Sequence, residues 1–381
     1  MANKNLSTAK KAKKDEFYTQ YADINCEMQA YLDYDADVFR GKTILLPCDD
    51  PDWSNFTKFF AENFELFGLK KLISTSYAFN SKKTLWQDCL PGLENKVSEN
   101  VLKSANYDAK SDCEHGKIFI LDEDTNKSGH IDIDDLKWDY LKGDGDFRSD
   151  EVKKLRDEAD VIITNPPFSL FREFLAWIVA ADKKFAIIGN QNAITYKDVF
   201  PLIKGNKMWL GATGFSNDMV FAVPKGTEVP EAYKQKAAKM GYVGDFTRMG
   251  NTCWFTNIEH GRRHTPLKLM TKAENIKYSK HKVVKGIGYH KYDNYDAIEI
   301  PFTDAIPSDY DGVMGVPITF LDKYCPEQFE IVGATESEGH GFSNGLWNAA
   351  SGTAQALVEG ARAYKRIFIR FRKPQGKEKK K

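Results

Sequence analysis

The chain has 381 residues, and its 54 lysines and arginines are balanced by 54 aspartates and glutamates, so its formal net charge is zero. This length can bury a large core in one or two domains. Neutrality excludes an overall basic field, so any contact with nucleic acid needs local cationic patches.

Cysteine usage and hydropathy exclude several other classes. The six cysteines are scattered without a Cys-x-x-Cys pair, which argues against a disulfide framework and a thiolate zinc site. No run approaches the ~20 apolar residues that a membrane span needs. The lysine-rich start has no apolar segment behind it, so we expect a cytoplasmic protein without a secretory signal.

The chain begins with a polar stretch. Residues 1–14 carry lysines at positions 10, 11, 13 and 14, which indicates a flexible tail or, alternatively, an arm that contacts phosphates. Asp15–Tyr21 follows, with two carboxylates and three aromatic rings, and leads into an expected helix through Met28 and Leu32. Its rings could simply pack this helix against a sheet.

The first buried strand is expected at Thr43–Cys48, before a polar turn and a phenylalanine-rich helix. Strand, turn and helix open many nucleotide-binding α/β domains. The turn, Asp49–Asn55, has no glycine that would let a pyrophosphate approach, and its three aspartates would repel one. The turn therefore favours a cationic ligand. Alternatively, any single aspartate there could interact favourably with the dipole at the N-terminus of the helix.

Further strands are expected at Lys71–Tyr77 and Lys117–Leu121. Asp124–Asp135 then has the spacing of an EF-hand calcium loop, with glycine at its sixth place. Its last ligand is an aspartate where glutamate is usual, and the segment before it is typical of a strand and not of a helix. We interpret it as an acidic surface loop, predict no metal site, and leave calcium open at this loop.

Asp160–Phe168 joins a strand to a rigid turn. Its β-branched run is typical of a strand buried on both faces of a parallel sheet. Pro166 and Pro167 remove two backbone donors and keep Asn165 extended, so the strand ends there. Carbonyls, the Asn165 amide and the Phe168 ring suit a planar ligand with an exocyclic amine. The simpler alternative is a proline turn in which Asn165 caps the helix that begins near residue 169.

Helices and strands alternate around this turn. An amphipathic helix is expected at residues 149–158, a second helix from Leu170 to about Ala181, and a buried strand at Phe185–Asn190. The alternation predicts a largely parallel sheet with helices on both faces.

From Lys204 onward, short strands are separated by glycine and proline turns. They are expected at Met208–Leu210, Met219–Val223 and Thr252–Thr256. His260–His264 is basic and holds two histidines four residues apart. Gly261 weakens a helix there and no third ligand is near, so we do not expect a metal.

The last expected strand, Lys365–Lys373, alternates apolar and basic residues. Ile367, Ile369 and Phe371 fall on one face, which predicts a buried side; the other face carries Arg366, Arg370 and Arg372. Such a basic face suits DNA as well as it suits solvent.

Five motifs follow one another along the chain. They are Asp15-Glu16-Phe17-Tyr18-Thr19, Asp49-Asp50-Pro51 with Ser54-Asn55-Phe56, Gly145-Asp146-Phe147, Asn165-Pro166-Pro167-Phe168 and Thr252-Cys253-Trp254-Phe255-Thr256-Asn257. Each is weak alone. Together, in this order and spacing, they resemble the EcoRI-type adenine-specific DNA methyltransferases over about residues 14–372.

The resemblance implies an α/β fold, namely a Rossmann-like class I sheet of S-adenosylmethionine-dependent methyltransferases with a C-terminal target-recognition region. It implies S-adenosyl-L-methionine as methyl donor and a flipped-out adenine in double-stranded DNA as the acceptor at N6. The donor's methionine end would lie against Phe17, Tyr18, Thr19, Asp49, Asp50, Pro51 and Ser54. The donor's adenine would be held by Asp146 and Phe147. The target adenine would be held by Asn165, Pro166, Pro167 and Phe168.

The resemblance and the charge distribution predict three regions. Residues 1–14 would be a basic flexible tail, 15–260 a methyltransferase catalytic domain, and 261–381 a target-recognition and DNA-binding region. The expected DNA-contacting arginines are Arg262, Arg263, Arg366, Arg370 and Arg372. Double-stranded DNA is the expected partner. A cognate restriction endonuclease that acts on the same site without a stable complex is a further candidate.

Departures from the family pattern leave the ribose contacts and two alternatives open. The turn after the first strand lacks the usual glycines, Gln20 stands where proline often follows Tyr-Thr, and no acid ends the strand at Tyr77. An Asn-Pro-Pro-aromatic turn also occurs in release-factor glutamine methyltransferases, and a degenerate methylase core could be an inactive DNA-binding protein. The basic last strand and the intact motifs favour a site-specific DNA adenine-N6 methyltransferase.

Overall fold

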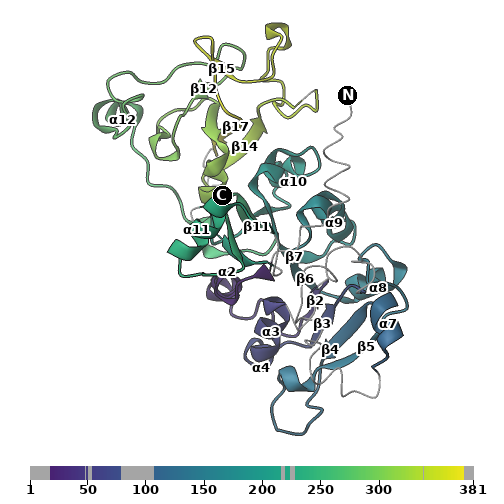
Figure 1. Ribbon diagram of the computed structural model, residues 1–381. Helices are drawn as coiled ribbons and strands as arrows, with labels where there is room; N and C mark the ends of the chain where they lie inside the picture. The colour runs from purple at the N-terminus through teal and green to yellow at the C-terminus, as the bar shows by residue number, and fades with distance from the viewer. Residues whose placement is uncertain are drawn as a thin grey trace, which may run out of the picture. The chain divides into compact units, whose positions relative to one another are not determined.

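The computed structural model describes residues 18–47, 49, 54–78, 107–215, 219–223, 228–337 and 339–372. The chain forms two compact units (Figure 1). The first comprises Met1–Gln191 and Thr213–Glu259, and the second Asn192–Ala212 and His260–Lys381. No helix in the described part of the chain is long and apolar enough to cross a membrane.

The first unit is built on a mixed sheet in which its strands lie in the order β5-β4-β3-β2-β6-β7-β11. Their bounds are β2 Thr43–Leu46, β3 Lys71–Thr75, β4 Lys117–Leu121, β5 Lys137–Tyr140, β6 Val161–Thr164, β7 Lys184–Asn190 and β11 Thr252–Thr256. The pairs β2–β3, β2–β6 and β6–β7 are parallel, whereas β3–β4, β4–β5 and β7–β11 are antiparallel. The expectation of a largely parallel sheet is therefore wrong beside β3, because β4 returns antiparallel and forms a hairpin with β5.

Helices cover both faces of this sheet, as predicted. Figure 1 shows α2, α3 and α4 on one side and α8 and α9 on the other. Their bounds are α2 Tyr21–Tyr34, α3 Asn55–Glu62, α4 Phe64–Phe67, α7 Ala109–Glu114, α8 Asp150–Glu158 and α9 Phe171–Val179. Ile163 and Ile188 pack in one core cluster with Phe59. Gly189, on the opposite face, lets α9 approach, since a Cβ there would lie 2.3 Å from the Phe171 ring.

A small three-stranded sheet completes the first unit. Strand β1, Tyr18–Thr19, pairs antiparallel with β9, Met219–Ala222, and β9 pairs with β10, Phe246–Met249. Helix α11, Glu231–Lys239, lies between β9 and β10 in sequence. The pairing holds the Tyr-Thr motif in an extended conformation.

The second unit contains a four-stranded sheet, in the order β12-β13-β17-β14, and a hairpin of β15 and β16. Its bounds are α10 Phe200–Lys204, β8 Trp209–Leu210, α12 Lys272–Tyr278, β12 Ile298–Glu299, β13 Met314–Pro317, β14 Phe329–Ala334, β15 Leu357–Val358, β16 Ala361–Arg362 and β17 Arg366–Phe371. Short 3-10 helices lie at Gly261–His264, Thr303–Ala305, Ile318–Lys323 and Ala349–Ser351.

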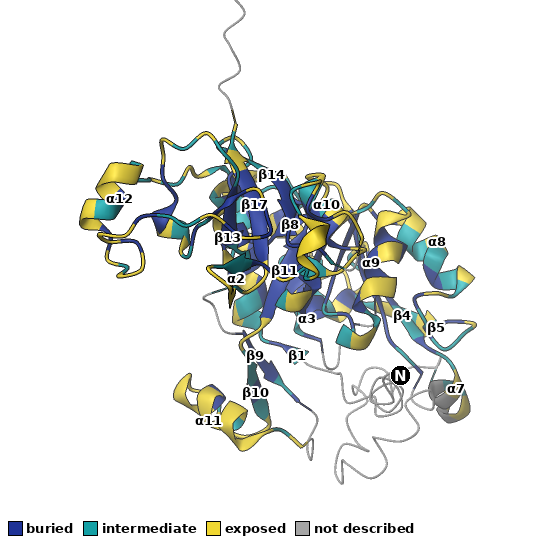
Figure 2. Ribbon diagram, turned by 90° about the horizontal axis from the view of Figure 1, so that it is seen from above, coloured by how far each residue is buried: buried dark blue, intermediate teal, exposed yellow. Residues whose placement is uncertain are grey.

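Strand β17 is more buried than its sequence predicts. It lies between β13 and β14 and pairs antiparallel with both. Residues 366–369 are all buried, as the dark blue ribbon of β17 in Figure 2 shows, and within the strand only Arg370 is exposed. The expectation of one buried and one solvated face is therefore wrong for the first half of this strand, because it is an inner strand whose two faces are both covered.

The aromatic core beside α3 offers a test of the fold. Phe59 is 1% exposed, and its ring centroid lies 5.2 Å from that of Phe60 and 5.7 Å from that of Phe67. We expect Phe59→Ala to lower the free energy of unfolding by about 3–5 kcal/mol, since it leaves a cavity. Leu66→Ala nearby is the control: this side chain is 74% exposed, so the change should stay within about 0.5 kcal/mol. Urea unfolding measures both, and equal losses would contradict this packing.

Candidate functional site

Asp49 joins two neighbouring strands of the first unit at their carboxyl ends. It follows β2 closely and is 8% exposed. Ser54 Oγ donates to its Oδ1 at 2.7 Å, and Thr164 Oγ1 donates to its Oδ2 at 2.6 Å. Thr164 is the last residue of β6, and Asn165 comes next. The turn after β2 and the Asn-Pro-Pro-Phe turn are therefore held together by one carboxylate.

The electrostatics of Asp49 suit a cation. Burial raises the pKa of this carboxyl to about 7, although the hydrogen bonds from Thr164 and Ser54 lower it. A positive charge beside it would favour the ionised form. Of the neighbouring residues expected to bind the donor, Asp50 and Pro51 lie outside the described residues, as does Phe17.

Thr19 is tied to the same turn. The Asn55 side chain, at the start of α3, donates from Nδ2 to the Thr19 carbonyl oxygen at 2.8 Å. Thr19 is 2% exposed, and its Oγ1 is buried without a hydrogen-bond partner among the residues described. Buried hydroxyls are usually satisfied, so this one is suited to a polar ligand. Tyr18, beside it in β1, is half-buried.

Asp146 is placed by a glycine. Gly145 has a φ of +88°, and a Cβ there would lie 2.3 Å from the Ser76 carbonyl oxygen, just beyond β3. Only glycine fits, so the chain passes close to the end of β3. Arg148 donates to the Asp146 carboxylate at 2.9 and 2.5 Å. Burial raises the pKa of Asp146, but hydrogen bonds from Arg148 and Tyr77 outweigh it and hold the pKa at about 2.

Phe147 lies in the core and anchors this turn. It is 2% exposed, and its ring centroid lies 5.1 Å from that of Phe174 and 5.6 Å from that of Trp177, both on α9. The ring therefore packs against the helix, and its expected contact with the donor's adenine stays a prediction.

The Asn-Pro-Pro-Phe turn follows β6 directly. Asn165 and Phe168 are half-buried, Pro166 is buried, and Phe168 packs against the core. A 3-10 helix begins at Phe168 after Pro167, and α9 begins after Leu170; neither has a side-chain cap. The alternative in which Asn165 caps the following helix is therefore wrong. Its side chain lies at the carboxyl end of β6 and not at a helix N-cap.

The structure brings the described site residues to one edge of the sheet. Asp146 lies near the end of β3, Asp49 near the end of β2 and Asn165 at the end of β6, and these strands are adjacent and parallel. Sequence reasoning missed the residues that fix them: Thr164 bonds Asp49, and Arg148 bonds Asp146. The contact of Arg148 could have been predicted from the sequence, because Arg148 stands two residues after Asp146. The contact of Thr164 could not, because Thr164 is 115 residues from Asp49.

The acidic loop Asp124–Asp135 uses its carboxylates for internal hydrogen bonds. Asp135 accepts hydrogen bonds from the amides of Thr125 and Asn126 at 2.8 and 3.0 Å, and Asp124 accepts from Gly129 at 2.8 Å. Within the described ranges, no group of three or more His, Cys, Asp or Glu residues could hold a metal ion.

Arg262 and Arg263, which were expected to contact DNA, make contacts within the second unit. Arg262 donates to the Ala212 carbonyl oxygen at 2.7 Å and pairs with Asp322. Arg263 is 4% exposed, lies 3.8 Å from the Trp209 ring centroid, and bonds Asn206. The predicted DNA contact of Arg263 is not supported, because its guanidinium is stacked inside the unit.

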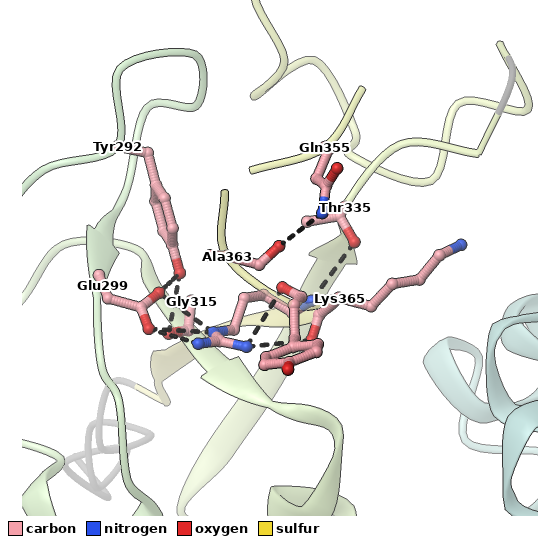
Figure 3. Close-up of polar contacts among 9 residues, drawn as sticks. Tyr292, Glu299, Gly315, Thr335, Gln355, Ala363 and Lys365 are labelled. Carbon is pink, nitrogen blue, oxygen red and sulfur yellow. Dashed lines mark hydrogen bonds and ion pairs between the residues drawn. The ribbon is translucent and has the colours of Figure 1, made fainter. Parts of the chain in front are cut away.

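Arg366 is also an internal residue. It is 9% exposed, and its Nη2 pairs at 2.6 Å with Oε1 of Glu299, which Figure 3 labels beside Tyr292. Tyr292 donates its hydroxyl proton to the same carboxylate. Burial and the Glu299 charge raise the pKa of Tyr292 above its usual value. The predicted DNA contact of Arg366 is not supported, because the buried pair satisfies its charge.

Arg370 and Arg372 are exposed, unlike Arg366. Arg370 pairs with Glu330 at 2.9 Å with half of its side chain in solvent. Arg372 Nε donates to the Phe329 carbonyl oxygen at 3.2 Å. These two side chains stay candidates for contact with DNA.

Comparison with known proteins assigns the chain. The family model described as adenine-specific methyltransferase EcoRI matches residues 5–372. The chain is 42% identical over 87% of its length, and 89% of the relative's, to the type II methyltransferase M.EcoRI of Escherichia coli. It is 31% identical over 86% of its length, and 84% of the relative's, to the type II methyltransferase M.MpnI of Mycoplasma pneumoniae. No solved structure gives a significant match. The chain therefore belongs to the EcoRI family of adenine-specific methyltransferases.

Proposed function

We propose that this protein is a site-specific DNA methyltransferase that transfers a methyl group from S-adenosyl-L-methionine to N6 of a flipped-out adenine in double-stranded DNA. The observation that carries the proposal is the Thr164–Asp49 hydrogen bond of 2.6 Å. It fixes the turn suited to a cationic donor beside the Asn-Pro-Pro-Phe turn suited to an adenine. Family membership supplies the adenine and the methyl transfer.

The residues present fit this donor. Asp49 is a buried carboxylate whose two oxygens each accept one hydrogen bond, which leaves lone pairs for an ammonium. Thr19 offers its buried hydroxyl. Asp146 is ionised at any physiological pH and accepts from donors such as an exocyclic amine. When bound, S-adenosylmethionine supplies an electrophilic methyl group on a sulfonium.

The Asn-Pro-Pro-Phe turn would hold and orient the base. Flipping costs a few kcal/mol, and stacking on the half-buried Phe168 ring would offset part of it. The amine of adenine is a poor nucleophile, because its lone pair is delocalised into the ring. Acceptance of its two protons by the Asn165 side-chain oxygen and the Pro166 carbonyl oxygen would favour a pyramidal nitrogen. Catalysis then rests on positioning and electrostatics and needs no strong general base.

The fold and the other partners follow from the same proposal. The sheet would be a Rossmann-like methyltransferase sheet, with the second unit as a target-recognition region in which Arg370 and Arg372 contact DNA. A cognate restriction endonuclease would act on the same DNA site without a stable complex, and the enzyme would work in the cytoplasm. The glutamine-amide alternative is disfavoured by membership in an adenine-specific family.

Asn165 provides the direct test of activity. DNA from a methylation-free host that expresses the wild type should contain N6-methyladenine at a fixed sequence. Asn165→Ala should lower turnover more than about ten-fold, which is ~1.4 kcal/mol, because the amine loses an acceptor. Donor affinity and melting temperature should be unchanged.

The exposed neighbour Ser169 gives the matched control. Ser169→Ala should retain wild-type turnover. An Asn165→Ala protein that keeps more than about a tenth of wild-type turnover would remove this turn from the active site.

Asp49 makes donor affinity depend on pH. Its pKa of about 7 means that it ionises as the pH rises through neutrality, and a cationic donor prefers the ionised form. Affinity for S-adenosylmethionine should therefore rise roughly eight-fold between about pH 6 and 7.5, with proton release on binding. Calorimetry in buffers of different ionisation enthalpy measures both. Asp49→Asn should bind more weakly and without this pH dependence; an identical dependence in the variant would contradict the role.

Asp146 and Glu173 form a matched pair of carboxylates, since Arg148 contacts both. We expect Asp146→Ala to weaken donor binding by about 1.5–3 kcal/mol, the value of a hydrogen bond to a charged group. Glu173→Ala should leave donor affinity unchanged. If calorimetry shows equal affinities for both variants, Asp146 acts only through Arg148 and does not contact the donor.

A further inference from the structure

Residues 272–291, here called the lysine platform, form a folded segment of the second unit. It begins with α12, which Thr271 and Glu274 close with a reciprocal capping box. Asn275 is fully buried, and its Nδ2 donates to the Met270 carbonyl oxygen at 3.3 Å. The helix is therefore anchored on one side, while Figure 2 shows much of its surface exposed.

The rest of the platform folds back on this helix. The Gly286 amide donates to the Ile276 carbonyl oxygen at 2.8 Å, and Val284 is fully buried. The His281 ring stacks on Phe302 at 3.7 Å and bonds Asp304 at 2.7 Å. These contacts fix the backbone from which the outer side chains project.

The platform is strongly basic within a neutral chain. It carries six lysines against one glutamate, a formal net charge of +5, and all six lysines are exposed: Lys272, Lys277, Lys280, Lys282, Lys285 and Lys291. The nearby acids are engaged within this region: Glu274 caps the helix, Asp304 pairs with Lys280 and His281, and Asp309 accepts a hydrogen bond from the Lys272 amide. Lys277, Lys282 and Lys285 make no ion pair with any residue that the structure describes.

Apolar side chains stand among these lysines. Val283 is 53% exposed, Ile287 62% and Tyr278 60%. An ordinary solvated face would carry polar residues at such positions, whereas surfaces that enter a nucleic-acid groove combine cations for phosphates with apolar side chains for sugars and base edges. A neutral protein that holds a duplex needs its unpaired cations gathered in one place.

We propose that the lysine platform binds double-stranded DNA, with Lys277, Lys282 and Lys285 on phosphates and Val283 and Ile287 against the groove. The proposal rests on the proposed function, because that function supplies DNA as the partner. It assigns to lysines the contacts that Arg263 and Arg366 cannot make from their buried positions.

The test compares two matched pairs of exposed lysines in the full-length protein. Lys282→Gln with Lys285→Gln removes two charges from the platform. Lys42→Gln with Lys70→Gln removes two exposed charges at the amino ends of β2 and β3, away from the edge that carries the site. Affinity for a short fluorescent DNA duplex is titrated against salt.

Each phosphate contact contributes about 0.9 to the slope of log affinity against log salt. The double variant Lys282→Gln with Lys285→Gln should make the slope shallower by up to about 1.8. The ratio of wild-type to variant DNA affinity should therefore fall roughly ten-fold between about 50 and 200 mM salt. The control pair should keep the wild-type slope. Val283→Ser with Ile287→Ser should weaken binding without changing the slope.

The outcomes separate this inference from the function on which it rests. A platform pair with the wild-type slope, or a control pair that lowers the slope equally, overturns the inference even if the wild type methylates adenine. A wild type that binds DNA but leaves adenine unmodified overturns the proposed function instead. Binding to phosphatidylserine vesicles, with a DNA slope that the platform pair leaves unchanged, would place a membrane on this surface and also overturn the inference.

Discussion

The site depends on one buried carboxylate. Asp49 is almost removed from solvent, so it needs partners, and it takes them from Ser54 and from Thr164. Ser54 is also the N-cap of α3, and Thr164 is the last residue of β6. The same hydrogen bonds that satisfy Asp49 therefore fix the start of a helix and the end of a strand. A substitution at Asp49 therefore disturbs the turns on both sides of the site. For this reason, a measurement of donor binding distinguishes its role toward the donor from its structural role.

The parallel strands explain why distant motifs meet. Strands β3, β2 and β6 are adjacent and run in one direction, so the segments that leave them emerge at one edge. Glycine at position 145, with φ of +88°, then lets the Asp146 turn pass close to the end of β3. The antiparallel β4–β5 hairpin lies outside these strands. Asp49, Asp146 and Asn165 thus come from turns that the sheet must bring together.

The local sequence pattern predicted the positions of the strands well but the exposure of the arginines poorly, and the reason is physical. β4 and β11 have the predicted bounds, because β-branched and aromatic runs between polar turns leave little choice. Arg366 alternates with apolar residues as an exposed residue would, yet it is buried, because its face is covered and Glu299, 67 residues away in the chain, pairs with it. Alternation reports which residues share a face; it does not report whether another part of the chain covers that face and brings a counter-charge.

In the second unit, the buried cationic side chains are arginines, whereas the lysines of the platform are exposed, and the chemistry of the two groups explains the difference. A guanidinium is planar and weakly hydrated, so it tolerates burial between Trp209 and Asn206 or beside Glu299. An ammonium is strongly hydrated, and a lysine side chain keeps it in water at the end of a flexible stem. Arg263 and Arg366, which look like part of a DNA surface in the sequence, are buried in the fold, whereas Arg370 and Arg372 stay exposed. The cations proposed for a polyanion therefore include the lysines of the platform, whose one acid, Glu274, already caps α12.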